Sequence, residues 1–103
     1  MKSIIGLLII TTILFAQESC NSYANVAGFV MQERQTHGDI TVFIDKLPEP
    51  QTQEDRDDYE TVVDMAVLAW SWPYYQQQSH KEEAVVLFRN QFYIECVKIQ
   101  RGE

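Results

Sequence analysis

The sequence predicts an all-α fold, a small bundle of three main helices plus one short helix, clasped by one disulfide. In three segments of the chain, apolar residues recur at the i, i+3, i+4, i+7 spacing that places them on one helix face. All three prolines lie between these segments, where they end helices without interrupting one. The two cysteines lie near opposite ends of the region that the segments span, so a single pairing is available.

Residues 1–16 have the layout of a secretory signal peptide. Met1–Ser3 supply a positive charge, Ile4–Phe15 is predominantly apolar, and Ala16 is a small residue at the end of that stretch. The apolar stretch is shorter than the ~20 residues that a transmembrane helix needs. We therefore expect cleavage after Ala16 and a single helical domain over residues 17–103, with an uncleaved signal that anchors the chain as the alternative.

Export determines how the two cysteines are interpreted. Thiols oxidise outside the cytoplasm, so we expect Cys20 and Cys96 to form a disulfide in a periplasmic or secreted protein. Closing a loop of this size stabilises a folded chain by on the order of 4 kcal/mol, because it removes entropy from the unfolded state.

The first helix of the mature chain is expected from Cys20 to about Gln35. It ends before His37 and Gly38, since glycine favours the conformation found at the carboxyl end of a helix. Its apolar face comprises Tyr23, Val26, Ala27, Val30 and Met31.

The segment Ile40–Leu47 is interpreted as the short helix, with Asp39 as its capping residue. Its β-branched residues suit a strand equally well, so a strand is the alternative. Pro48 and Pro50 then begin a polar linker, because the residue before each proline is disfavoured in a helix.

The next helix is expected from about Asp55 to about Ser71, before Pro73. Because this helix is apolar on almost every side, we expect it to lie centrally or to bind another molecule with one face. Its main apolar stripe is Tyr59, Val62, Val63, Ala66, Ala69 and Trp70, and a second stripe is Met65, Leu68 and Trp72.

The last helix is expected to open with a capping box, Ser79–Glu82, in which the serine and glutamate side chains satisfy free backbone amides. The alternative is a hairpin of Ala84–Phe88 and Phe92–Val97 around Asn90, which the continuous helical spacing disfavours. The apolar residues at that spacing are Ala84, Val85, Phe88, Phe92, Cys96 and Ile99.

A set of residues spread along the chain carries a resemblance: Cys20, Val30-Met31, Arg34-Gln35, Ala69, Pro73-Tyr74, Ala84, Phe88-Arg89-Asn90, Phe92-Tyr93 and Cys96. The set resembles a family of small exported helical proteins, described as hypothetical proteins, from proteobacteria and their phages. The resemblance covers nearly all of the mature chain. It implies an all-α fold clasped by the two cysteines, with no assigned activity. The chain departs from the family in its longer acidic linker and in Trp70 and Trp72, where the family more often has one aromatic residue and one polar residue.

The chain is acidic, with a formal net charge of −7. This charge argues against nucleic acid and against an anionic membrane surface as the main partner. The acidic residues gather in the run Glu54–Asp64. Counted from Asp55, the run lacks the glycine and the final glutamate that an EF-hand calcium loop requires, so we interpret it as a solvated helix amino terminus.

No catalytic arrangement is recognisable in the sequence. The two histidines, His37 and His80, belong to no metal-ligand motif, so we expect no catalytic residue, metal or cofactor. The alternative is a small metal-dependent hydrolase that uses His80, Glu83 one helical turn away, and the acidic run.

We interpret two arginines, Arg34 and Arg89, as residues that stabilise the fold. Arg34 lies on the apolar face of the first helix, so we expect its stem to pack there and its charge to pair with Asp64 or Glu95. Arg89-Asn90 interrupts the apolar run of the last helix and is expected to reach a neighbouring helix end.

The aromatic segment Trp70–Tyr75 is the feature most open to a functional interpretation. Pro73 ends the helix, and Trp72 points away from the main apolar stripe, toward the second one. Since Trp and Met are enriched in the cores of interfaces, these residues predict a non-catalytic binding or accessory module with a protein partner in the envelope or outside the cell. The candidate partner surface comprises Met65, Leu68, Trp72 and Tyr75.

Overall fold

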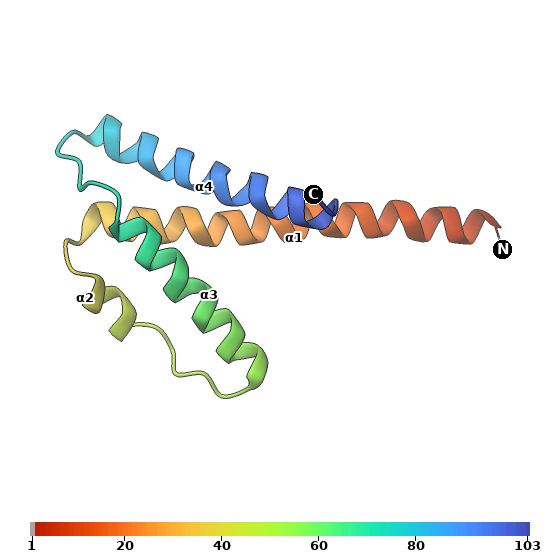
Figure 1. Cartoon of the computed structure of the whole chain (residues 1–103), viewed down its shortest axis with the longest axis horizontal. Helices are drawn as coiled ribbons and strands as arrows, with labels where there is room; N and C mark the ends of the chain where they lie inside the picture. Colours follow the sequence, from red (N-terminus) through yellow and green to blue (C-terminus); the bar gives the residue numbers. More distant parts are fainter. Residues whose placement is uncertain (1) are drawn as a thin grey trace.

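A computed structural model describes residues 2–103 of the chain, with side chains described from Ser19 onward. These residues form four helices and no strand (Figure 1). The helices are α1 (Lys2–Thr36), α2 (Ile40–Asp45), α3 (Gln53–Trp70) and α4 (Gln78–Gln100). The predicted fold class, three main helices with one short helix, is confirmed.

Helix α1 is the axis on which the other elements are assembled. Helix α4 lies antiparallel along α1, and this is the most extensive helix pair in the molecule (Figure 1). Helix α3 contacts α1 near the carboxyl end of α1 and runs diagonally away from it, and α2 packs on α3 (Figure 1). Helices α3 and α4 share few direct contacts and diverge from each other (Figure 1).

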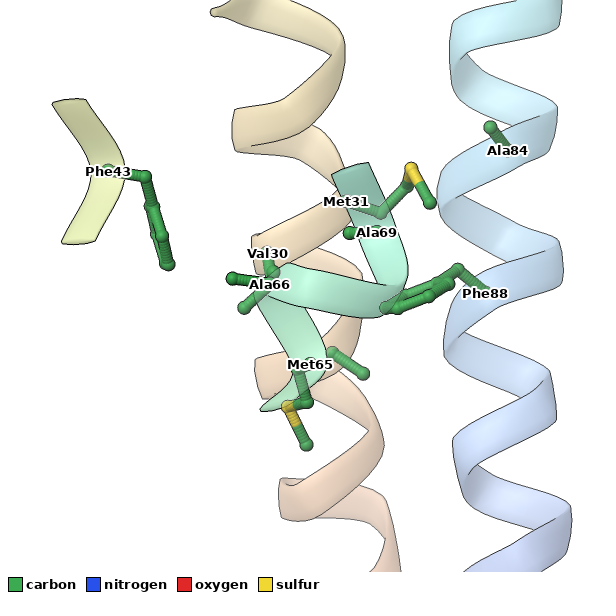
Figure 2. Close-up of a cluster of buried hydrophobic side chains, with 9 residues drawn as sticks. Val30, Met31, Phe43, Met65, Ala66, Ala69, Ala84 and Phe88 are labelled. Atoms are coloured by element: carbon green, nitrogen blue, oxygen red, sulfur yellow. The ribbon is translucent and has the colours of Figure 1, made fainter. Parts of the chain in front are cut away.

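The core lies where α1, α3 and α4 meet. Figure 2 shows side chains of all three helices converging there, with Phe43 of α2 added from one side. Small side chains let the helices approach closely. At Gly28 of α1, an added methyl group would lie 3.4 Å from Cβ of Arg89 on α4. The buried cluster consists of Ala27, Val30, Met31, Phe43, Met65, Ala66, Ala69, Ala84 and Phe88.

Both alternatives that involved β-structure are wrong. Residues Ile40–Asp45 are helical, and Asp39 caps them by accepting a hydrogen bond from the backbone N–H of Thr41. Helix α4 continues through Asn90 without a turn. In both segments, burial of apolar side chains against a neighbouring helix outweighs the β-propensity of individual residues.

Two helix starts differ from the prediction. Helix α3 begins before Asp55, because the Thr52 side chain accepts a hydrogen bond from the Asp55 N–H at 3.0 Å and caps the helix. Helix α4 begins at Gln78 after Gln77, so Ser79 lies inside its first turn and the predicted capping box is wrong. A serine inside the first turn is past the position from which its hydroxyl accepts the free amides.

Helix α1 begins at Lys2, well before Cys20, where the first helix of the mature chain was expected to start. The expected cleavage position after Ala16 therefore lies within a continuous helical backbone. The side chains of residues 1–16, on which the signal-peptide prediction rests, lie outside the described part of the chain.

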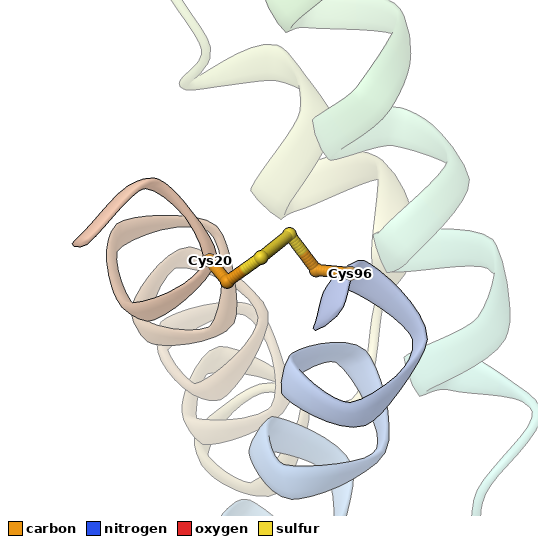
Figure 3. The surroundings of a disulfide bond; sticks show 2 residues. All are labelled: Cys20 and Cys96. Atoms are coloured by element: carbon orange, nitrogen blue, oxygen red, sulfur yellow. A yellow bond between two sulfur atoms is a disulfide. The ribbon is translucent and has the colours of Figure 1, made fainter. Parts of the chain in front are cut away.

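The predicted disulfide is present. Cys20 of α1 and Cys96 of α4 are bonded across 76 residues of sequence, and their Cα atoms are 5.5 Å apart (Figure 3). The bond joins the end of the α1–α4 pair that lies farthest from the loop between α3 and α4. The two helices are thus held at one end by that loop and its contacts and at the other by a covalent bond.

Candidate functional site

The four residues of the candidate partner surface differ in their exposure. Met65 is 1% exposed and belongs to the core, so it contributes nothing to a surface. It belongs to the same buried cluster as Ala66 and Ala69 of α3. Leu68 is 52% exposed, whereas Trp72 and Tyr75 are half-buried and pack against the core.

Trp72 lines two hollows whose walls are mostly apolar. Its ring meets that of Phe88 edge-on, with the centroids 5.5 Å apart. The first hollow has a volume of about 220 Å³ and the second a volume of about 170 Å³. The first is lined by Tyr23, Leu68, Trp72, Phe88, Gln91, Phe92 and Glu95, and the second by Trp72, Tyr75, His80, Glu83, Ala84 and Leu87. We call the residues lining these two hollows the Trp72 face.

The divergence of α3 and α4 creates the first hollow. The aromatic side chains that line this hollow form its floor, and they are Tyr23, Trp72, Phe88 and Phe92. The ring of Phe92 lies 4.9 Å from that of Phe88 and 5.7 Å from that of Tyr23, measured between centroids. Leu68 and Leu87, which are 52% and 50% exposed, lie on the two hollows and leave apolar surface in contact with water.

The loop that carries Trp72 is held by the carboxyl end of α1. Arg34 donates to the backbone carbonyl of Trp72 from Nε at 3.3 Å and from Nη2 at 3.2 Å. Gln35, only 4% exposed, donates to the carbonyl of Pro73 at 2.8 Å and accepts from the N–H of Tyr75 at 3.0 Å. These bonds satisfy buried backbone groups of the loop and fix the position of Trp72.

The predicted pairing of Arg34 with a carboxylate is wrong. Arg34 lies beside the loop after α3, whereas Glu95 lies next to Cys96, which bonds to Cys20 near the opposite end of the α1–α4 pair. The arginine instead contacts two aromatic rings, with its guanidinium carbon 5.9 Å from the centroid of Trp70 and 5.8 Å from that of Tyr74. Cation–π contacts and carbonyl hydrogen bonds thus replace the expected ion pair.

Lys81 of α4 contacts both the end of α1 and the loop that carries Trp72. Its Nζ lies 3.6 Å from the centroid of the Tyr74 ring and donates to the backbone carbonyl of Gln35 at 2.9 Å. That carbonyl is one of the last in α1 and has no partner within the helix, so the ammonium group also complements the negative end of the helix dipole.

Arg89 was expected to reach the end of a neighbouring helix, and it instead contacts α1 along its side. It donates to Oδ1 of Asn25 at 2.9 Å from Nε and to Oδ1 of Asn21 at 2.6 Å from Nη2. Sequence reasoning missed these two asparagines. Their spacing of four residues on one helix face was the available signal.

Carboxylates lie beside the apolar floor of the Trp72 face. Glu95 lines the first hollow and Glu83 the second. Burial raises the pKa of the Tyr23 hydroxyl, and the negative charge of Asp64 raises that pKa further. Asp64 on α3 therefore acts electrostatically on the floor of the first hollow.

The residues of the alternative metal site are divided between two parts of the molecule. His80 and Glu83 line the second hollow, where the ring of Tyr75 packs against His80 with the centroids 5.9 Å apart. Except for Asp64, the acidic run lies on the amino-terminal half of α3, and Asp55 and Asp58 line a separate hollow of about 300 Å³ beside the linker. Among residues with described side chains, no three His, Cys, Asp or Glu residues are grouped so as to hold a metal ion.

Comparison with known proteins gives no relative: no family model, curated protein or solved structure matches the chain. Within residues 19–103, no helix is long and apolar enough to cross a membrane.

Proposed function

We propose that the protein is an exported, non-catalytic binding module that docks a partner protein on the Trp72 face. The observation that carries the proposal is that Trp72 lines two mostly apolar hollows, with Leu68 and Leu87 exposed beside it. Aromatic side chains in a preformed pocket, surrounded by apolar residues that exclude water, are typical of the residues that dominate binding energy at protein interfaces.

The way in which the Trp72 loop is held supports this proposal. The hydrogen bonds from Arg34 and Gln35 hold the loop that carries Trp72, so the loop is ordered before any partner arrives. A surface that is already ordered loses less entropy on binding, and affinity is higher for the same contact area.

The disulfide and the amino-terminal segment support export. The Cys20–Cys96 bond is of a kind that persists in oxidising compartments and is rare in the cytoplasm. The composition of residues 1–16 is that of a signal peptide, which would deliver the chain to such a compartment.

Substitution of the exposed leucines tests the binding face. Trp72→Ala is a poor test, because Trp72 also packs on Phe88 and its loss would destabilise the core. We expect Leu68→Ser with Leu87→Ser to leave the melting temperature within a few degrees of wild type and to abolish capture of the partner from envelope or culture-supernatant fractions. The matched control is Val67→Ser with Ile94→Ser, at positions 57% and 51% exposed that line neither hollow. Equal capture by both double variants would rule out the Trp72 face as the binding site.

Mass spectrometry of the exported protein under non-reducing conditions tests the location. We expect a mature chain that begins at Gln17 and is lighter by two hydrogens than the reduced form, because the disulfide is closed. A chain that retains residues 1–16 would support the anchored alternative. Absence of the protein in any form from the envelope and supernatant fractions would contradict export.

A further inference from the structure

The Trp72 face combines an apolar floor with acidic walls. Glu95 and Glu83 line its two hollows, and no lysine or arginine lines either one. Lys98 lies beside Glu95, and the other cations near this surface are engaged elsewhere: Arg34 binds the Trp72 carbonyl, Lys81 binds the end of α1, and Arg89 binds asparagines on α1. A ligand with positive charge is therefore the one that this surface complements.

The α3 side of the first hollow carries a further negative charge. Asp64 precedes Leu68 by four residues, so both lie on the same face of α3, one turn apart. Its charge also raises the pKa of Tyr23, whose ring lines the first hollow. Helix α3 thus carries a carboxylate one turn from Leu68, and α4 contributes Glu95 to the lining of that hollow.

Lys98 partly neutralises the negative charge of Glu95. Its Nζ lies 4.0 Å from a carboxylate oxygen of Glu95, and both side chains are more than half exposed. Such a surface pair contributes little free energy, about 0–1 kcal/mol. A cation of a bound partner can therefore replace Lys98 at Glu95 with little cost.

The length of the acidic pattern indicates the size of the ligand. Glu83 and Glu95 are 12 residues apart on one straight helix, which corresponds to about 18 Å at 1.5 Å per residue. This distance is spanned by about 12 residues of a helical segment, or by half that number in an extended one.

We propose that the occupant of the Trp72 face is a basic amphipathic segment of a partner protein, in which Lys or Arg residues flank bulky apolar side chains. This inference rests on the proposed function and adds the chemistry of the partner. A second copy of the chain fits poorly, since each copy carries a net charge of −7 and the faces repel. An anionic membrane surface is repelled for the same reason.

Two synthetic peptides test the inference on the full mature protein with its disulfide intact. One is an amphipathic peptide of about 12 residues made of Leu and Lys, and the other has every Lys replaced by Glu. Binding is measured by calorimetry and by tryptophan fluorescence. We expect the Lys peptide to bind at least about ten-fold more tightly than the Glu peptide, and to lose affinity as salt is raised toward about 0.5 M.

Removal of charge at two sites distinguishes a specific site from general attraction to an acidic protein. We expect Glu83→Gln with Glu95→Gln to weaken binding of the Lys peptide at least about five-fold. The matched control, Glu49→Gln with Asp58→Asn, removes the same charge from the hollow beside the linker and is expected to change affinity less than about two-fold. Equal binding of both peptides, or equal effects of the two double variants, would overturn the inference.

The peptide experiment and the leucine double variant test different claims: the first tests the charge of the partner, and the second tests whether the Trp72 face binds a partner at all. If the Leu68 and Leu87 double variant loses partner capture while the peptides bind equally, the Trp72 face is a binding site for a partner of different chemistry. If capture is insensitive to those leucines, the proposed function itself fails, whatever the peptides do.

Discussion

Gln35 is a single buried polar residue that fixes the orientation of a whole loop. Its amide donates to the Pro73 carbonyl and accepts from the Tyr75 N–H, so it supplies the loop with the two backbone partners that a neighbouring strand would otherwise provide. Its own backbone carbonyl accepts from Lys81 on α4. Through these bonds one residue connects α1, the aromatic loop and α4.

Replacement of Gln35 is expected to destabilise the protein. Gln35→Ala removes the partners of the Pro73 carbonyl and the Tyr75 amide, two partly buried groups, and each lost hydrogen bond costs about 0.5–1.5 kcal/mol. We expect a loss of about 1–3 kcal/mol in the free energy of unfolding, measured by urea denaturation. Gln32→Ala, at an exposed position one turn earlier, is the control and is expected to change stability by less than about 0.5 kcal/mol.

Tyr23 is expected to titrate late and to couple stability to alkaline pH. Its pKa is raised in the folded state by burial and by Asp64, so the folded state holds the phenolic proton more tightly than the unfolded state. The resulting stability is complete below the unfolded pKa of about 10 and is lost as the pH rises through the folded pKa. The difference in phenolate absorbance between wild type and Tyr23→Phe isolates this group.

Asp64→Asn checks the electrostatic part of that shift. We expect this variant to lower the pKa of Tyr23, while Asp58→Asn, the same charge change on α3 away from the hollow, leaves it unchanged. No difference between the two variants would leave burial as the sole cause of the raised pKa.

Helix boundaries were the part of each element that the sequence predicted least well. The apolar spacing located α3 and α4 correctly, because each helix buries apolar side chains at that spacing in the core. The caps were missed at both helices, since a cap depends on the conformation of one residue outside the helix. Thr52 and Gln77 are in extended conformations that the apolar pattern does not encode.

Two serine and threonine substitutions test the caps directly. Thr52→Ala removes the side chain that accepts from the Asp55 amide, and we expect a loss of about 1 kcal/mol in unfolding free energy. Ser79→Ala is expected to have almost no effect, because Ser79 does not cap α4. A larger loss for the serine variant than for the threonine variant would restore the capping box that the sequence predicted.

The site was less predictable than the fold, for reasons that arise from the whole molecule. The period of α3 placed Met65 and Leu68 on one stripe, but a stripe does not specify where the neighbouring helices end. In the folded chain the boundary between core and surface passes between these two residues. Tyr23, Phe88 and Phe92 complete the first hollow from two other helices, so no local pattern near Trp72 identifies them.

Loss of the disulfide is expected to weaken the molecule at one end. For cysteines 76 positions apart in the sequence, the chain-entropy model gives about 4 kcal/mol of stabilisation. We expect Cys20→Ala with Cys96→Ala to lower the free energy of unfolding by about this amount. Hydrogen exchange should increase around Cys20 and Cys96 and remain slow near Gln35, where hydrogen bonds hold the other end. A uniform increase along α1 and α4 would contradict this local effect.

The pairing of α1 with α4 also determines the order in which the chain can fold. During synthesis α1 emerges first and α4 only after α2 and α3, so the two helices of the most extensive pair are made far apart in time. Until α4 arrives, the apolar face of α1 has only α3 to cover it, and the thiol of Cys20 has no partner. The disulfide therefore cannot form until synthesis is nearly complete. Its closure reports that α1 and α4, which are far apart in the sequence, have packed together.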